Sequence, residues 1–331
     1  MGKCFKKHQK HNEPSYFMNP KKNLGKALIL GGCGFLGSHV AEGLLESGYT
    51  VRIFDKVKVD TKNINHIIDD LHMMEGDFTN EKDIGRAIKG MDYIFHFIGT
   101  TLPKTSTENP IYDLKSNVIS TLKLLKLAAQ EKIKKIIFAS SGGTVYGTPQ
   151  TIPISEEHPT NPTSAYGISK LMVEKYLELY RLTNCLDYVI FRISNLYGER
   201  QNPHSIQGAI AVFLGLAKEE KPITIWGKGD ITRDYIYIKD ILPVLVNAIK
   251  TKTKQRIFNL GSGKGTTLNE LLAVIKEITG RAVKVTYTRQ RVIDVPKNVL
   301  DISRAREEFG FSPTTTLFDG VQKTWQWLNR S

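Results

Sequence analysis

The sequence predicts an α/β fold, a doubly wound parallel sheet with helices on both faces, and three observations lead to that prediction. Short apolar runs alternate with segments of helical periodicity from residue 26 to about residue 194. The runs are apolar almost throughout, which is typical of parallel strands covered on both faces. A glycine-rich turn follows the first run, and such turns join a strand to a helix at nucleotide sites.

The elements of this sheet can be assigned in order along the chain. Leu44 and Leu45 recur with Val40 and Ala41 at helical spacing, and Gly48 ends the segment. Other segments show the same two patterns. We expect strands at 26–30, 49–55, 92–99, 134–141 and 187–194, and helices at 38–48, 81–89, 115–131 and 165–182.

The alternation loosens after about residue 195, which indicates a smaller C-terminal α/β part that binds substrate. We expect helices there at 208–219, at 267–279 and through most of 303–330, and strands at 222–227, 234–238 and 256–263. The domains are then a nucleotide-binding domain at 24–194, with a return segment around 226–261, and a substrate-binding part at 195–331.

Residues 1–23 form a basic leader with six lysines and one glutamate, so they carry a large share of the formal net charge of +13. They lack the apolar segment of a secretory signal. We expect a solvated, disordered tail, and weak attraction to an anionic membrane surface is the alternative. The modestly basic remainder suits an anionic small substrate.

Composition and cysteine usage exclude several classes of protein. Cys4, Cys33 and Cys185 form no CxxC pair, which indicates a reducing cytoplasm and no metal site. No apolar run approaches the ~18 residues of a membrane span, so integral membrane contact is not expected. No basic stripe alternates with stacking aromatic residues, so nucleic-acid binding is not expected either.

The turn after the first strand, GGCGFLG, contains Gly31, Gly32, Gly34 and Gly37. In a Rossmann-type domain one glycine permits the tight turn, one lets the backbone approach a pyrophosphate, and one lets the helix pack on the sheet. The helix N-terminus then offers free N–H groups to the phosphates. An ordinary glycine-rich turn is the alternative, but the flanking strand and helix favour dinucleotide binding.

Asp55 ends the second strand, 18 residues after Gly37. A carboxylate at this place accepts hydrogen bonds from both ribose hydroxyls of NAD. It repels the 2′-phosphate of NADP, although Lys56 beside it weakens that effect. The predicted cofactor is therefore NAD.

Tyr166 and Lys170 are four residues apart on a predicted helix, so both side chains lie on one face. A lysine ammonium near a phenol favours the phenolate and makes tyrosine usable as a base. Such a pair alone is more often a solvated helix pair. Ser141, however, closes the strand IIFASS at the edge where ligands bind, and its hydroxyl could hydrogen-bond a substrate hydroxyl while Tyr166 takes the proton.

Four segments together resemble one family. SSGGTVYG (140–147), SAYGISK (164–170), FRISNLYG (191–198) and TRDYIYIKD (232–240) occur in the order found in extended short-chain dehydrogenases/reductases. Within that family they are most similar to nucleotide-sugar 4-epimerases of the UDP-galactose 4-epimerase kind. The resemblance covers about residues 24 to 330.

The resemblance implies cofactor contacts beyond the glycine turn. Asp77 matches the acidic residue that holds the adenine, and Asn117 matches an asparagine that lines the cofactor pocket. The whole implied NAD set is Gly31, Gly34, Phe35, Leu36, Gly37, Asp55, Asp77, Phe78, Phe97, Asn117, Tyr166 and Lys170.

The resemblance also implies a nucleotide-sugar site that includes Ser141 and Tyr166. Asn195 matches an asparagine at the diphosphate, and Arg233 and Arg291 match two arginines that clamp it. Trp226 falls where members place an aromatic ring against uracil. Turn capping, surface charge and core packing are the respective alternatives. Asn298 stands where some members carry a bulky tyrosine, and a smaller residue leaves room for an N-acetyl group.

Three departures from the family pattern affect these roles. Residues 96–99 (HFIG) replace the frequent His-Leu-Ala-Ala, so the contacts under the cofactor can differ. Residues 142–144 (GGT) carry one residue more than the commoner version, so the hydroxyl role of Ser141 could belong to Thr144. Residues 291–294 (RVID) replace Arg-x-Gly-Asp, which makes the role of Arg291 less certain.

The implied activity is 4-epimerisation of a UDP-hexose, with either an N-acetylated or a plain sugar, by a homodimer. Tyr166, helped by Ser141, removes the 4-hydroxyl proton while NAD takes the C4 hydride and later returns it to the other face. Lys170 lowers the tyrosine pKa and holds the nicotinamide ribose.

Two rival functions remain open. A 4,6-dehydratase or reductase has the same fold, but dehydratases place an Asp-Glu pair where this chain has Gly142 and Gly143. A non-catalytic NAD-binding sensor or scaffold would have no need of an activated phenol.

Overall fold

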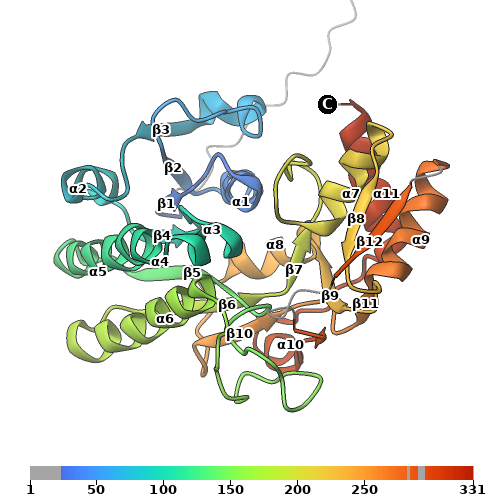
Figure 1. Ribbon diagram of the computed structural model, residues 1–331. Coiled ribbons are helices and arrows are strands. Elements are labelled where there is room, and N and C mark those ends of the chain that lie inside the picture. Colours follow the sequence, from blue (N-terminus) through green and yellow to red (C-terminus); the bar gives the residue numbers. More distant parts are fainter. Residues whose placement is uncertain (1–23, 282–283, 290–294, 331) are drawn as a thin grey trace, which may run out of the picture.

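The computed structural model describes residues 24–281, 284–289 and 295–330, and a seven-stranded parallel sheet forms the larger part of the fold (Figure 1). The strand order is β10-β6-β5-β4-β1-β2-β3. The bounds are β1 Lys26–Leu30, β2 Thr50–Asp55, β3 Leu71–Glu75, β4 Tyr93–His96, β5 Lys135–Ser141, β6 Tyr188–Ile193 and β10 Ile257–Leu260. The predicted Rossmann-type fold is confirmed, and β10 joins the sheet from the later part of the chain.

Helices cover both faces of this sheet, as the continuously apolar strands predicted. On one face α1 (Phe35–Glu46) packs with α8 (Ile238–Asn247), and on the other α2 (Glu81–Ile88), α5 (Ser120–Gln130) and α6 (Ala165–Asn184) share a second apolar cluster. Helix α8 was not predicted. Pro243 lies inside it and interrupts the sequence signal, because proline disfavours a helix interior.

The expected helix at 115–131 is not a single α-helix. Residues Leu114–Ile119 form a π-helical turn before α5 begins at Ser120. The Ser120 hydroxyl donates to the Lys115 carbonyl, 3.2 Å away, within this widened turn. Such turns occur frequently at functional sites, and two short helices, α3 (Pro103–Glu108) and α4 (Pro110–Asp113), lead into this one.

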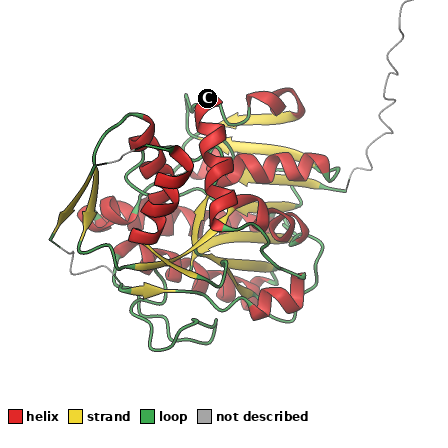
Figure 2. Cartoon of the chain, turned by 90° about the vertical axis from the view of Figure 1, so that its right-hand side faces the viewer, coloured by secondary structure: helices red, strands yellow, loops and turns green. Residues whose placement is uncertain are grey.

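The C-terminal part contains two small sheets covered by helices (Figure 2). One sheet joins β7 (Asn195–Tyr197), β9 (Thr232–Tyr237), β11 (Gly265–Thr267) and β13 (Lys297–Asn298), and the other pairs β8 (Ile223–Trp226) with β12 (Val285–Thr288). The helices are α7 (Ala209–Lys218), α9 (Leu268–Thr279), α10 (Ser303–Phe309) and α11 (Leu317–Arg330); a 3₁₀ helix, η1 (Asn65–Asp70), belongs to the first part.

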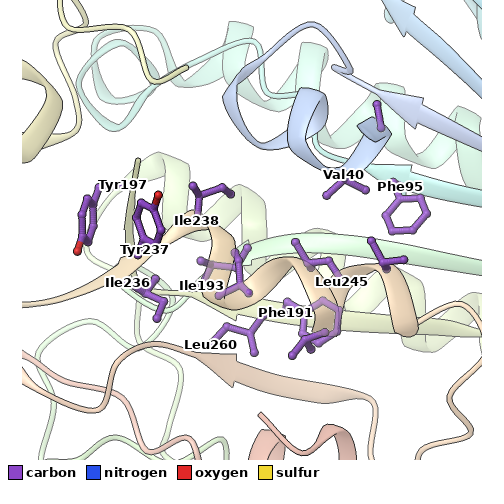
Figure 3. Close-up of a cluster of buried hydrophobic side chains, with 14 of the residues drawn as sticks. Val40, Phe95, Phe191, Ile193, Tyr197, Ile236, Tyr237, Ile238, Leu245 and Leu260 are labelled. Carbon is purple, nitrogen blue, oxygen red and sulfur yellow. The ribbon is translucent and has the colours of Figure 1, made fainter. Parts of the chain in front are cut away.

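One apolar cluster runs from the main sheet into the C-terminal part (Figure 3). Phe191 of β6 and Leu245 of α8 belong to it in the main sheet and its covering helix, and Tyr197 of β7 and Tyr237 of β9 continue it into the C-terminal part. The two parts therefore share a packed core, and packed cores resist displacement.

The strand order reverses between β1 and β4, which are neighbours in the sheet. Ligands bind in such folds at the carboxyl ends of the strands on either side of the reversal. Gly31 follows β1 and Phe97 follows β4, so the predicted dinucleotide turn lies at this point. Among the described residues, no helix has both the length and the apolar character needed to cross a membrane.

Candidate active site

The glycine turn is built from contacts that leave no room for side chains. Gly31 has a φ of +83°, and a Cβ there would lie 3.1 Å from the backbone nitrogen of Ile98. A Cβ on Gly37 would lie 2.2 Å from the carbonyl oxygen of Gly31. Helix α1 can approach the turn this closely only because both residues are glycines.

Helix α1 begins without a side-chain cap. Gly34 is the N-cap residue, and no side chain accepts a hydrogen bond from the first turn. Phe35 and Leu36 occupy that turn, and both are half-buried. The N–H groups and the positive end of the helix dipole are therefore available to phosphate oxygens.

The Asp55 carboxylate lies beside the turn, as expected. One oxygen accepts a hydrogen bond from the backbone N–H of Cys33 at 3.0 Å, and the other accepts one from the N–H of Lys56 at 2.9 Å. Glu75 is its partner in register on β3. Two neighbouring carboxylates disfavour a 2′-phosphate, which supports NAD rather than NADP.

The residues expected around the adenine differ in what their side chains do. Asp77 is exposed, and one of its oxygens accepts hydrogen bonds from the backbone N–H and the hydroxyl of Thr79, both at 2.8 Å. Phe78 is buried with its ring 5.4 Å from that of His96, so its side chain serves the core. Phe97 is half-buried next to Phe95.

The Asn117 amide fixes the loop that follows β4. Its oxygen accepts hydrogen bonds from the Thr100 N–H at 3.0 Å and the Thr100 hydroxyl at 3.1 Å. Its NH₂ group donates to the Thr101 hydroxyl at 3.0 Å and to Asp113 at 2.9 Å. This side chain thus holds the loop after β4, whose residue Ile98 lies against the glycine turn.

The structure brings Tyr166 and Lys170 together at the start of α6, beside the carboxyl end of β5. The Lys170 ammonium lies 5.7 Å from the centre of the Tyr166 ring and donates a hydrogen bond to the Ala139 carbonyl at 2.8 Å. The hydroxyl of Ser164 caps the helix by accepting from the Gly167 N–H. Ser141 is the last residue of β5.

The protein environment shifts both pKa values away from their usual range. Burial of the phenol, together with the negative charge of Asp113, raises the pKa of Tyr166 to about 12. Burial lowers the pKa of Lys170 to about 8. Burial and the charge of Asp113 therefore oppose the lowering of the tyrosine pKa that is expected from Lys170.

Two hydroxyls compete for the role assigned to Ser141. The Thr144 hydroxyl is buried and has no hydrogen-bond partner among the described residues. Ser140, one residue before Ser141, is already engaged, since its hydroxyl donates to Glu174. An unpaired buried hydroxyl is costly, and a substrate oxygen would satisfy it.

Three of the expected substrate residues meet on the sheet around β9. Asn195 of β7 pairs in register with Tyr235, and Asn298 of β13 pairs with Arg233. One terminal nitrogen of Arg233 donates to the carbonyls of Thr232 at 2.9 Å and of Val295 at 2.7 Å. These two contacts to backbone carbonyls thus fix one edge of the Arg233 guanidinium.

Trp226 is an expected substrate residue that lies on the other small sheet. Trp226 ends β8 in the other small sheet, and its side chain is 45% exposed. Arg291 lies outside the described residues. Asn298 is buried, and its NH₂ group donates to the Gly142 carbonyl at 3.0 Å, which ties it to the turn after Ser141.

Two buried carboxylates at this site were not identified from the sequence. Asp113 accepts hydrogen bonds from the side chains of Thr101, Asn117 and Ser169. Asp234 accepts from the backbone N–H groups of Ser262, Gly263 and Leu300 and so joins three segments. The spacing of Asp113 four residues before Asn117 was a usable signal, but the other partners are distant in sequence.

The residues present fit a dinucleotide and a phenol-based proton transfer. A cradle that a Cβ would fill, uncapped helix N–H groups and the Asp55 carboxylate match the phosphates and ribose of NAD. Tyr166 lies on the helix that faces the end of β5, where a substrate hydroxyl would be held. The arrangement can remove a proton from an alcohol next to a hydride acceptor.

Comparisons with known proteins agree with this geometry. The family model described as "NAD dependent epimerase/dehydratase family" matches residues 27–261. A putative UDP-glucose 4-epimerase of Methanocaldococcus jannaschii is 37% identical over 92% of this chain and 98% of its own length. UDP-glucose 4-epimerase of Thermotoga maritima, crystallised with UDP-glucose, is 33% identical, with a TM-score of 0.87 over 92% of this chain and 99% of its own.

A further solved structure bears on the size of the sugar. UDP-N-acetylglucosamine 4-epimerase of Methanobrevibacter ruminantium, in complex with UDP-N-acetylmuramic acid, is 28% identical. Its TM-score is 0.86, and the match covers 93% of this chain and 99% of the other.

Substitution of Gly37 by alanine should prevent α1 from docking and should abolish cofactor retention. The added Cβ would meet backbone atoms, which cannot move aside as a side chain can, and overpacking costs roughly 1–3 kcal/mol. Gly85→Ala in α2 is the matched control, because a Cβ there meets nothing within 4 Å. Denaturant unfolding and the NAD content of purified protein are measured; a Gly37→Ala protein as stable and as loaded as the control would contradict the packing argument.

Proposed function

We propose, because this chain belongs to the NAD-dependent epimerase/dehydratase family, that it interconverts the C4 epimers of a UDP-hexose with NAD as its cofactor. The observation that carries the proposal is the position of Tyr166 and Lys170 at the carboxyl end of β5, on the same edge of the sheet as the glycine turn after β1, in a chain that matches 4-epimerases along nearly their whole length. Epimerisation by this route requires no net oxidation.

Tyr166 is proposed to take the proton of the sugar 4-hydroxyl. The hydroxyl of Ser141, or that of Thr144, donates a hydrogen bond to the same oxygen and holds it near the phenol. NAD, when bound, supplies a reversible acceptor for the C4 hydride and a positive charge that favours the phenolate. The same phenol gives the proton back after the 4-keto sugar has turned its other face.

Lys170 is proposed to stabilise the phenolate of Tyr166. Its pKa of about 8 leaves it mostly protonated at neutral pH, so its ammonium stabilises the phenolate as it forms. The bond to the Ala139 carbonyl fixes the lysine at the end of β5. Asn195 and Arg233 are proposed to bind the diphosphate, and Trp226 to contact the uracil.

The sugar is proposed to include N-acetylated hexoses. Asn298 is smaller than tyrosine, and its side-chain oxygen has no hydrogen-bond partner among the described residues. An acetamido N–H would satisfy that oxygen. The relative from Methanobrevibacter ruminantium, named for UDP-N-acetylglucosamine, supports this choice.

A dehydratase acting through an acidic pair is sterically disfavoured. A Cβ on Gly142 would lie 2.5 Å from a methyl group of Leu300 and 3.0 Å from the Arg192 carbonyl oxygen. A side chain at that position would force Leu300 and the backbone at Arg192 to shift. Neither Gly142 nor Gly143 supplies the acid that would eliminate water from the 4-keto sugar.

We further propose a cytoplasmic homodimer that forms through the outer face of α5 and α6. Ile168, Leu179 and Leu182 recur along one face of α6 and are 48%, 46% and 64% exposed. Ile119, just before α5, is also exposed. Exposed apolar stripes of this kind mark interfaces, and free Cys33 and Cys185 agree with a reducing compartment.

Tyr166→Phe should lower turnover roughly 10²- to 10⁴-fold, because general-base catalysis contributes about that much. Epimerisation of UDP-glucose and UDP-N-acetylglucosamine is followed by proton NMR. Tyr176→Phe, on the same helix, is the control and should keep its activity. Full activity of Tyr166→Phe would refute the proposed base.

Asn298→Tyr should lower kcat/KM for UDP-N-acetylglucosamine roughly 10- to 100-fold more than for UDP-glucose, because steric discrimination has about that size. Asn298→Ala, which keeps the pocket open, is the matched control. Competition of the two sugars in one NMR assay gives the ratio directly. Turnover of UDP-glucose alone by the unmodified protein would contradict the proposed pocket.

Leu179→Glu combined with Leu182→Glu should convert the dimer into a monomer, because charges on an apolar interface must be desolvated without partners. Light scattering after gel filtration measures the mass. Ile206→Glu, a similarly exposed residue outside α5 and α6, is the control and should remain dimeric. An unmodified protein that is already monomeric would contradict the proposed interface.

A further inference from the structure

A buried carboxylate beside Tyr166 and Lys170 has no part in the reaction described so far. Asp113 ends α4 and is 1% exposed. One oxygen accepts hydrogen bonds from the Thr101 hydroxyl and, at 2.9 Å, from the Asn117 NH₂ group, and the other accepts one from the Ser169 hydroxyl. These partners come from the loop after β4, the π-helical turn and α6, so the carboxylate joins these three segments.

All three of these partners are neutral donors. Among the described residues, no cation forms an ion pair with Asp113. A buried charge without a counter-charge is unfavourable, so the carboxylate needs a cation in its surroundings. Ser169, which donates to Asp113, directly precedes Lys170 in the chain.

The other charged groups near Lys170 do not provide an equivalent field. Glu174 lies one turn further along α6 and also raises the pKa of Lys170, but less than Asp113 does, and Arg192 pairs with it through contacts of 2.6 and 3.1 Å. Lys104 and Glu108 on α3 face each other at 3.9 Å in solvent, and Lys115 of the π-helical turn is exposed. On β4, the buried His96 has its pKa lowered to about 3 by burial, so it stays neutral.

We propose that Asp113 is a positioning residue, whose charge keeps the Lys170 side chain an ammonium and whose hydrogen bonds hold α6 against the Asn117 turn. The inference rests on the proposed 4-epimerase function and adds a residue to it. Asp113 acts through Lys170 and Tyr166 and need not touch substrate or cofactor.

The negative charge of Asp113 shifts the pKa values of Lys170 and Tyr166 in the same direction. It raises the pKa of Lys170 against the lowering caused by burial, and it raises the pKa of Tyr166 further. Removal of the charge should therefore lower both pKa values. The limb of the pH profile that is set by ionisation of the phenol and the limb that is set by loss of the ammonium should both move to lower pH.

The test is the pH profile of kcat for UDP-sugar epimerisation in the unmodified protein and in Asp113→Asn. Both limbs should shift to lower pH in the variant. Ser169→Ala removes one hydrogen bond but keeps the charge, so it should reduce kcat without moving the limbs. Glu108→Gln removes an exposed carboxylate from neighbouring α3 and should change neither the maximal kcat nor the positions of the two limbs of the pH profile.

A second readout does not depend on turnover. The Lys170 side chain is titrated by NMR of carbon-13-labelled lysine, with its signal assigned by Lys170→Met. Its titration midpoint should lie near the pKa of about 8 in the unmodified protein and lower in Asp113→Asn. A protein without activity on any UDP-hexose would refute the proposed function, and this titration would still decide the role of Asp113.

An Asp113→Asn profile that is lower but unshifted, with an unchanged Lys170 midpoint, would overturn the proposal and leave a purely structural role. Asp113→Ser provides a second neutral variant with a smaller side chain. Failure of both variants to fold would also overturn it, since the carboxylate would then serve the fold rather than Lys170.

Discussion

The contact between Gly37 and the Gly31 carbonyl is the constraint on which the two halves of the site depend. It sets the height of α1 above the sheet, and α1 packs against α8. Helix α8 follows β9 directly, and β9 carries Arg233. The glycine turn thus positions the proposed phosphate site of the cofactor. Through α1 and α8 it also positions β9, which carries Arg233, the proposed ligand of the substrate diphosphate. The shared apolar core makes this coupling rigid.

Desolvation is the dominant electrostatic effect at the other end of the pocket. Burial disfavours the phenolate of Tyr166 and the ammonium of Lys170 alike, so each charged form exists only with help from neighbours. Tyr166 is consequently a poor base until positive charge is brought close to it. An unpaired buried phenolate would be costly in these low-dielectric surroundings.

Features that depend on neighbouring residues in the chain could be predicted from the sequence, and those that depend on distant ones could not. The glycine turn, Asp55 and the Tyr166–Lys170 spacing are local patterns, so the sheet and the cofactor end of the site could be derived. The partners of Asp113 lie 12 and 56 residues away at Thr101 and Ser169, and no periodicity connects them. The burial of Tyr166 could not be predicted for the same reason, since burial is a property of the folded chain.

Sugar choice and reaction class are physically linked in this pocket. Asn298 donates to the carbonyl of Gly142, and Leu300, two residues further along, fills the space where a side chain at position 142 would lie. The segment proposed to shape the sugar pocket therefore also crowds position 142 in the turn after Ser141. Residues that share a packed contact rarely act additively. A substitution at position 298 that changes the sugar preference would therefore also change the surroundings of the Ser141 and Thr144 hydroxyls. Sugar preference and reaction class would then constrain each other.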